Sequence, residues 1–405
     1  MTRKLTWDLG LAFSGVLALV LAVWPAVGRL GPTAGIAAAE EAMPADYWTV
    51  AVPFQGQAPA HWSDLEKSLA PESCADCHED QYADWRTSLH AGSFSLGLVG
   101  QMLSMYRQSV ANCMQCHAPL TEQRTDFMAA LADGVGHVGE RQGLAAAGVA
   151  CAACHVRNHR RFGPPQRDTG AVGASDPDNP HGGVHRAAWF EKSEFCVVCH
   201  QFPQEYAVNG KPLENTYVEW QASPQAAQGI TCQVCHMPER RHLWRGIHDP
   251  DMVAAGLTAH FSATAEEARF TLTNSGVGHA FPTYVTPRVE MHAVALDADG
   301  REVPATAVLH VIQRAVAHTG GRWVENFDSR LLPTESATLS LPWQGYAKAR
   351  LWLEVKPDDY YDNYIYDVLL SDVVPGSPAE RLLARADRAA HGSSYRLFDT
   401  EIDRP

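Results

Sequence analysis

The chain has 405 residues, of which 46% are hydrophobic, and it carries a formal net charge of −14 at pH 7. This length and apolar content are sufficient for two domains. The acidic balance argues against nucleic acid or an anionic membrane surface as the binding partner.

Residues 1–30 have the pattern of a targeting segment, in which an apolar run over 9–27 follows a basic start. The run is longer than the roughly 7–15 residues of a signal-peptide core and nearer the roughly 17–25 of a spanning helix. We therefore favour an uncleaved membrane anchor, and small residues at 26–28 and 37–39 leave a cleaved signal as the alternative. Either version places the rest on the periplasmic or outward-facing side of the cytoplasmic membrane. Residues 31–70, rich in Ala, Pro and Gly, predict a tether.

Between residues 74 and 236 the pattern Cys-x-x-Cys-His occurs five times. Two thiols at this spacing can bond covalently to one haem, and the adjacent imidazole then ligates its iron. Zinc knuckles and thioredoxin-like pairs also use Cys-x-x-Cys, but neither gives the following His a role. The sequence therefore predicts five covalently attached haem c groups. The attachment residues are Cys74 and Cys77, Cys113 and Cys116, Cys151 and Cys154, Cys196 and Cys199, and Cys232 and Cys235, and the proximal ligands are His78, His117, His155, His200 and His236.

Residues 71–265 are predicted to form the haem domain, mostly helical and irregular. The first cysteines of successive motifs are 36 to 45 residues apart, too short a distance for separate hydrophobic cores. The haem groups must then supply much of the interior and lie close together. Short helices are expected over 79–89, 121–132 and 216–221, and from the Asp249-Pro250 cap to Gly256.

After residue 265 the cysteines end and alternating apolar patterns begin, so residues 266–405 predict an antiparallel β-sandwich-like domain. The expected strands cover 270–273, 288–296, 301–303, 308–313, 337–341, 351–355 and 366–370. A capping box at Ser377-Pro-Ala-Glu380 predicts a closing helix to about Ala390. The fold class is therefore α+β, with a haem domain, a β domain and an N-terminal hydrophobic segment.

The second axial ligand of each iron decides the function. A second His gives a low-potential electron carrier, a Met raises the potential, and an open position permits substrate chemistry. Of 19 histidines, five lie in the motifs and 14 remain. From their local context, the candidate distal ligands are His90, His137, His185, His248 and His279. His181 is the alternative to His185, whereas His159 and His242, which lie among arginines, are predicted not to be ligands.

Several segments around the motifs resemble one known family. They are Cys74–His90, Gly148–Arg157, Phe195–Phe202, Asn215–Trp220, Cys232–Pro238 and Gly278–Thr283. Over about 71–290 the chain resembles the multihaem c-type cytochromes that include the tetrahaem electron acceptor of hydroxylamine oxidoreductase. The resemblance implies packed haem pairs, mostly bis-histidine ligation, a distal role for His90, and electron transfer in nitrogen or sulfur metabolism. Tyr284 stands where the family pattern has Gly.

These observations predict a periplasmic pentahaem cytochrome that transfers electrons, and we assign no catalytic residue. Its partners would be redox proteins, either a membrane quinol oxidase or cytochrome or a soluble oxidoreductase, and a cationic partner surface would complement the acidic chain. The alternative is an oxidoreductase that acts on a small nitrogen or sulfur compound at one five-coordinate haem. The two differ in whether every iron has two protein ligands, and fold class does not decide between them.

Overall fold

The computed structural model describes residues 42–48, 52–103, 105–133, 142–167 and 180–405. The predicted anchor or signal segment, residues 1–30, and the candidate ligand His137 lie outside these residues. Within the described part of the chain, no helix is long and apolar enough to cross a membrane.

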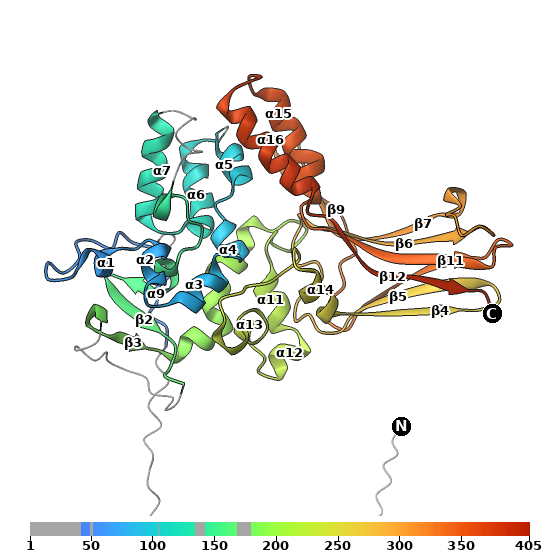
Figure 1. Cartoon of the computed structure of the whole chain (residues 1–405), viewed down its shortest axis with the longest axis horizontal. Coiled ribbons are helices and arrows are strands. Elements are labelled where there is room, and N and C mark those ends of the chain that lie inside the picture. The colour runs from blue at the N-terminus through green and yellow to red at the C-terminus, as the bar shows by residue number, and fades with distance from the viewer. Residues whose placement is uncertain (1–41, 49–51, 104, 134–141, 168–179) are drawn as a thin grey trace, which may run out of the picture. The chain divides into compact units, whose positions relative to one another are not determined.

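The first part of the chain folds into short helices joined by irregular segments (Figure 1). The helices are α1 (Asp64–Lys67), α2 (Pro71–Ala75), α3 (Glu79–Trp85), α4 (Leu89–Gly92), α5 (Leu96–Met102), α6 (Arg107–His117), α7 (Thr121–Asp133), α9 (Cys151–His155), α10 (Val197–His200), α11 (Thr216–Gln221), α12 (Pro224–Ala227), α13 (Cys232–His236) and α14 (Pro250–Gly256). A small sheet joins β1 (Val156–Arg157) to β2 (Arg160–Gly163) in antiparallel and β2 to β3 (Val184–Arg186) in parallel.

Local capping explains where these helices begin. The expected helices are confirmed as α7, α11 and α14, and the Asp249 side chain accepts the N–H of Met252 at the start of α14. The single helix expected over 79–89 is wrong in extent. It is divided because Ser88 accepts the N–H of Ala91 and so begins α4 as a separate helix. This break positions His90 in the first turn of α4.

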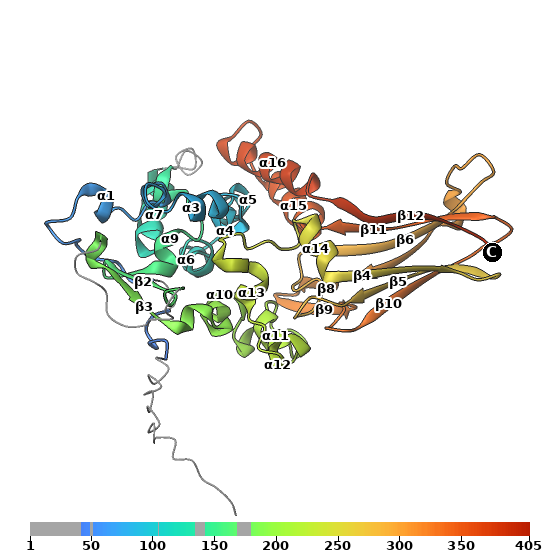
Figure 2. The same ribbon diagram turned by 60° about the horizontal axis from the view of Figure 1, so that its bottom comes forward.

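The C-terminal part is an antiparallel β-sandwich with two sheets (Figure 2). Its strands are β4 (Leu257–Ala263), β5 (Glu267–Asn274), β6 (Arg288–Leu296), β7 (Val308–Ile312), β10 (Ser336–Pro342), β11 (Lys348–Lys356) and β12 (Tyr395–Asp403). One sheet has the order β10-β5-β4 and the other the order β12-β11-β6-β7. Side chains from both sheets, among them Phe270, Met291, Leu341 and Leu351, form one buried core. The first strand begins at Leu257, before the predicted domain boundary.

The segment predicted as a strand over 366–370 is instead helical, which corrects that prediction. A π-helical turn (Tyr361–Ile365) leads into α15 (Tyr366–Asp372), and the capping box then starts α16 (Pro378–His391) as predicted. The apolar residues from 361 to 373 recur three or four positions apart, the spacing of one helix face, and they pack against α16. Strands β4 and β12 and the hairpin of β8 (Arg314–Thr319) and β9 (Arg322–Asp328) were not predicted from the sequence.

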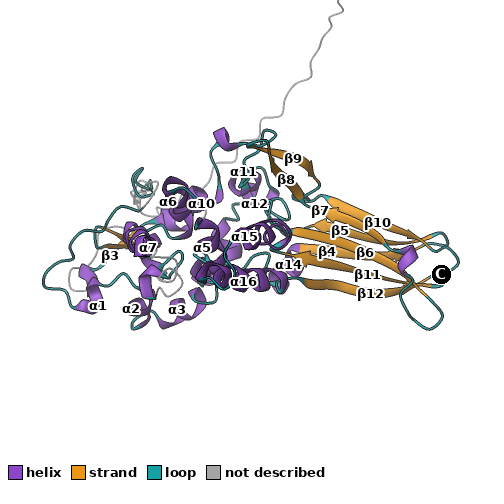
Figure 3. Cartoon of the chain, turned by 90° about the horizontal axis from the view of Figure 1, so that it is seen from above, coloured by secondary structure: helices purple, strands orange, loops and turns teal. Residues whose placement is uncertain are grey.

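The hairpin of α15 and α16 is an insertion between β11 and β12 that packs against α5 of the haem domain (Figures 1 and 3). Two glycines of α5 permit this approach. A Cβ atom at Gly97 would lie 1.9 Å from the Tyr366 hydroxyl, and one at Gly100 would lie 2.5 Å from Leu383. The β domain therefore contributes one wall of the haem domain.

A second contact between the domains is ionic and buried. The Arg330 guanidinium lies 3.1 Å from Glu219 of α11 and 2.9 Å from Asp328 of β9. Arg314, at the start of β8, donates 2.9 Å and 2.8 Å hydrogen bonds to the carbonyl oxygens of Val208 and Lys211 in the haem domain. These contacts fix the β8–β9 hairpin against the haem domain.

Candidate functional site

One large cavity of about 3690 Å³ runs through the haem domain. This is several times the roughly 300–1,000 Å³ of a pocket for one small ligand. All ten cysteines of the five motifs line it, and so do all five histidines predicted to be proximal ligands. No disulfide joins any of these cysteines in the described structure. The size of the cavity and the donors on its wall therefore fit several haem groups in mutual contact.

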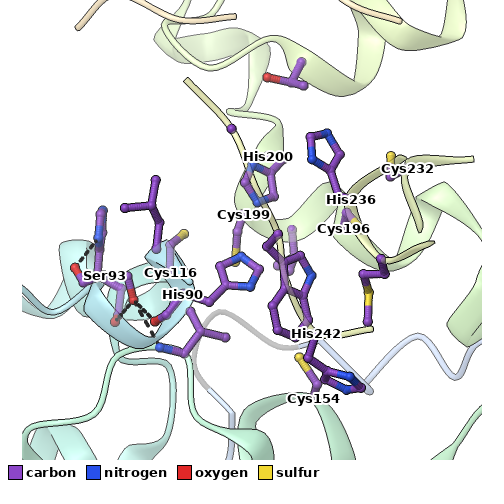
Figure 4. Close-up of a pocket in the computed structure, with 18 of the residues that line it drawn as sticks. His90, Ser93, Cys116, Cys154, Cys196, Cys199, His200, Cys232, His236 and His242 are labelled. Carbon is purple, nitrogen blue, oxygen red and sulfur yellow. Dashed lines mark hydrogen bonds between the residues drawn. The ribbon is translucent and has the colours of Figure 1, made fainter. Parts of the chain in front are cut away.

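Five further histidines line the same cavity. They are His90, His181, His242, His248 and His279. The cavity wall thus carries ten imidazoles, five from the motifs and five from outside them. Figure 4 shows His90, His200, His236 and His242 gathered in one part of the cavity beside cysteines of four motifs.

Three pairs of rings have the spacing expected across one metal ion. The ring centroids are separated by 6.2 Å for His90 and His200, 6.2 Å for His155 and His242, and 6.4 Å for His236 and His279. A metal-bound imidazole nitrogen lies about 2 Å from its ion, so two opposed imidazoles have ring centres about 6 Å apart. Each pair joins one motif histidine to one histidine from outside the motifs. The geometry therefore matches bis-histidine ligation at the third, fourth and fifth motifs.

Backbone carbonyls orient the motif histidines. The Nδ1 atoms of His117, His155 and His236 each lie 2.8 Å from a backbone oxygen, belonging to Ser93, Phe162 and Arg245, respectively. A hydrogen bond from Nδ1 leaves Nε2 available to a metal ion and fixes the ring direction. The cavity residues are therefore held in the tautomer that iron ligation needs.

Burial keeps four of the cavity imidazoles neutral. It lowers the pKa of His90 to about 3 and the pKa values of His155, His200 and His279 to about 4, with smaller effects from neighbouring histidines. Only a deprotonated ring nitrogen can bind a metal ion. These four rings are consequently ready to ligate at neutral pH.

Cysteines of different motifs lie close together, which shows how the attachment points are arranged. Cys74 lies beside Cys151, Cys116 beside Cys199, and Cys196 beside Cys232. Cys154 also lies near both cysteines of the fourth motif. The motifs therefore form a continuous series in the order first, third, fourth and second, with the fifth beside the fourth.

The distal candidates from the sequence fall into three groups. His90, His248 and His279 line the cavity, His137 lies outside the described residues, and His185 does not line the cavity although both neighbours in β3 do. Side chains alternate along a strand, so Val184 and Arg186 point toward the cavity and His185 points away. His181, the alternative to His185, lines the cavity, and its Nδ1 is buried without a hydrogen-bond partner.

His242 is a cavity histidine that sequence reasoning assigned to the non-ligands. Its backbone N–H donates a 3.1 Å hydrogen bond to Asp84 of α3, and its Nδ1 lies 3.0 Å from the Arg240 oxygen. Asp84 is 158 positions away in the sequence, so only the folded chain brings the two together. Arg241, one of the surrounding arginines, pairs with the same Asp84 carboxylate.

His248 has a different environment from the other four. Its Nε2 lies 2.9 Å from the Asp358 carboxylate, and its Nδ1 is buried without a partner. Asp358 belongs to a loop of the β domain, and its backbone oxygen accepts a 2.9 Å hydrogen bond from the N–H of Tyr361. Tyr361 lines the cavity and lies near Cys113 of the second motif. His248 therefore lies in the part of the cavity near the second motif.

Glu214 is a cavity residue without a role in haem attachment. Its carboxylate accepts a hydrogen bond from Thr216, whose hydroxyl lies 2.5 Å from that of Thr283. Burial raises the pKa of Glu214 to about 7, and the hydrogen bond from Thr216 offsets only part of this effect. The folded protein thus holds a proton on Glu214 that the unfolded chain releases near pH 4.5.

We expect Glu214→Gln to stabilise the protein at pH 8. A carboxyl whose pKa is raised on folding contributes stability that is complete below about pH 4.5 and lost as pH rises through about 7. The wild type should therefore lose about 3 kcal/mol relative to the variant between these limits. Guanidinium unfolding at pH 5 and pH 8 measures the difference, with the exposed Glu266→Gln as the control. Equal pH dependence in the two variants would contradict the prediction.

Comparisons with known proteins agree with this geometry. A sequence profile of the family "Cytochrome c554 and c-prime" matches residues 73–156. The crystal structure of a penta-heme cytochrome c552 from Thermochromatium tepidum is similar, with a TM-score of 0.56 and 20% sequence identity, and the match covers 84% of this chain and 100% of that chain. No curated protein sequence matches.

The sequence motifs, the cavity and the family match together identify a multihaem c-type cytochrome fold. The predicted cofactors, five covalently attached haem c groups, are confirmed. The mixed fold of a haem domain with a β domain is confirmed as well. The narrower resemblance to an electron acceptor of hydroxylamine oxidoreductase stays a prediction.

Proposed function

We propose that this multihaem c-type cytochrome is a periplasmic electron relay in which most haem irons have two histidine ligands. The observation that carries the proposal is the composition of the cavity wall, with one additional histidine for each motif histidine. Haem c bound by two histidines supplies one-electron redox chemistry at low potential and has no position open to substrate. This wall therefore favours electron transfer over catalysis.

The ring pairs support a specific set of distal ligands. We assign His242, His90 and His279 to the third, fourth and fifth motifs on the basis of these centroid distances. His181 is assigned to the first motif because it lines the cavity and interacts electrostatically with His78. His248 remains for the second motif. His279 comes from the β domain, so this ligand would join the two domains through the fifth haem.

The contacts between motifs support a continuous electron path. Neighbouring cysteines link the first motif to the third and the second to the fourth, and the fourth also lies beside the fifth. The fourth motif is therefore the junction of the path. Electrons would pass between a membrane-associated donor or acceptor and a soluble or surface redox protein, with the N-terminal segment as the proposed membrane tether.

A second candidate function rests on His248. Its Nε2 is engaged by Asp358, and within the described residues the His117 ring has no histidine ring opposite it at the spacing of the three pairs. If Asp358 retains His248, the haem of the second motif has one open face beside Tyr361. The protein would then be an oxidoreductase that acts on a small nitrogen or sulfur compound at that haem.

Electron paramagnetic resonance of the oxidised protein separates the two functions. The relay predicts that all five haems are low-spin. The enzyme predicts one high-spin haem of the five, whose signal changes when nitrite or hydroxylamine is added. Haem content by pyridine haemochrome assay must be determined on the same sample, because an incompletely loaded chain would also lose low-spin signal.

A further inference from the structure

The outward face of α15 combines acidic and apolar side chains. Tyr364, Val368 and Val374 are 60%, 59% and 72% exposed, and Asp367 and Asp372 are exposed beside them. Tyr364, Asp367 and Val368 are three or four positions apart, so they lie on one side of the helical segment. In the described part of the chain, neither carboxylate has a cation within ion-pair distance. Such a face combines apolar contact area with unneutralised charge, as docking surfaces do.

The same segment turns its other side toward the haem cavity. Tyr361 and Tyr366 line the cavity, and the Tyr366 hydroxyl lies against Gly97 of α5, which follows Ser93, whose backbone oxygen is 2.8 Å from Nδ1 of His117 in the second motif. The ring of Tyr360 connects the two sides, with its centroid 5.5 Å from that of Tyr364 and 6.4 Å from that of Tyr361. The exposed face is thus separated from the second-motif end of the cavity by about one helix diameter, roughly 10 Å.

The charge of this face selects the chemistry of its partner. Residues 357–374 contain five Asp and no Lys or Arg. Within the described residues, neighbouring α16 carries Arg381, Arg385 and Arg388, and none of them lies within ion-pair distance of Asp367 or Asp372; Arg385 lines the cavity and Arg381 donates a 2.7 Å hydrogen bond to the Gly376 oxygen. Complementary charge raises the rate of encounter between two proteins and orients them.

We propose that this face, formed by Tyr364, Asp367, Val368, Asp372 and Val374, is the docking surface for a basic redox protein. The partner carries lysine or arginine side chains around an apolar patch next to its own redox centre. One electron passes between that centre and the haem of the second motif, so one protein is oxidised as the other is reduced. The proposal rests on the electron-transfer function above. It adds the place at which electrons enter or leave the protein, here called the port, and the chemical class of the partner.

The test is the rate at which the fully reduced holoprotein reduces mitochondrial cytochrome c, a small basic haem protein, in stopped flow. We expect the wild-type rate to fall as ionic strength rises from about 10 to about 200 mM. The variant Asp367→Lys/Asp372→Lys should react about tenfold more slowly at low ionic strength and show a weaker salt dependence. The matched control is Glu266→Lys/Asp403→Lys, which makes the same charge change at exposed positions of the sandwich.

The rates of the wild type and the two variants decide whether this face is the docking surface. A tenfold loss in the α15 variant with a rate within about twofold of wild type in the control supports the proposal. Equal losses in both variants would show that net charge alone steers the partner, and no loss in the α15 variant would place the port elsewhere; either overturns the proposal. Oxidation by ferricyanide and haem content are measured in parallel. A wild type that reduces ferricyanide but never cytochrome c also overturns it, whereas failure with both oxidants removes the electron-transfer function itself.

Discussion

Replacing His242 with alanine is expected to convert one of the five haems from low-spin to high-spin. The His242 ring lies 6.2 Å from that of His155, and its Nδ1 is engaged by the Arg240 oxygen, so Nε2 is the nitrogen free to ligate. Without this ring the iron at His155 keeps one protein ligand. The change would appear in the electron paramagnetic resonance spectrum as a high-spin ferric signal from one haem in five.

His159→Ala is the matched control for this experiment. His159 is also a buried histidine in an arginine-rich segment, but its Nε2 lies 3.0 Å from the Gly56 oxygen and it does not line the cavity. We expect all haems to remain low-spin in that variant. Added imidazole should restore the low-spin signal of His242→Ala by filling the vacated position. If His242→Ala stays low-spin at full haem content, the assignment of this ligand is wrong.

The contrast between His159 and His242 explains which parts of the site could be predicted from sequence. Haem attachment is local, because the two thiols and the proximal imidazole lie within five consecutive residues. A distal ligand is non-local, since it comes from wherever the folded chain passes over the other haem face. His90 could be selected from the sequence because it lies shortly after α3 and close to the first motif, whereas the position of His242 depends on the hydrogen bond to Asp84 across 158 residues.

The fold likewise has elements that the local sequence predicts and elements that depend on contacts between distant segments. Helices with a cap in the sequence, such as α14 behind Asp249 and α16 behind Ser377, were predicted with nearly correct ends. The strand expected over 366–370 was wrong because an apolar run this short suits either a strand or a buried helix. What decides it is tertiary packing, in which Tyr366 and its neighbours cover α16 and contact Gly97 of α5. The helical spacing of the apolar residues becomes visible only over the longer range 361–373, not within the five residues of the predicted strand.

The buried interface between the domains gives the second large expected effect, through Arg314. Its side chain is fully buried, and its guanidinium lies 2.8 Å from Glu325 and donates to three carbonyl oxygens of the haem domain. Those oxygens belong to the turn over residues 208–212. One cation thus satisfies a carboxylate and three backbone acceptors in a mostly buried environment. Its removal takes a charged donor from all four groups. Glu325 keeps the Asn209 amide, and Val208 and Lys211 keep their mutual backbone hydrogen bonds, but the buried Glu325 carboxylate loses its closest cation, a loss that exceeds that of a surface ion pair.

Arg314→Met should therefore destabilise the protein by about 3–5 kcal/mol, the usual loss when one partner of a buried ion pair is removed. The control is Arg350→Met, which breaks a partly exposed pairing with Asp399 and Glu302 and should cost no more than about 1 kcal/mol. Guanidinium unfolding followed by circular dichroism measures both at equal haem content. Because the Arg314 contacts join the two domains, its variant should also separate the unfolding of the sandwich from that of the haem domain into two transitions. Similar midpoints and a single transition in both variants would contradict a structural role for this contact. The principal connection between the two domains would then be the fifth haem, for which we propose His236 of one domain and His279 of the other as ligands.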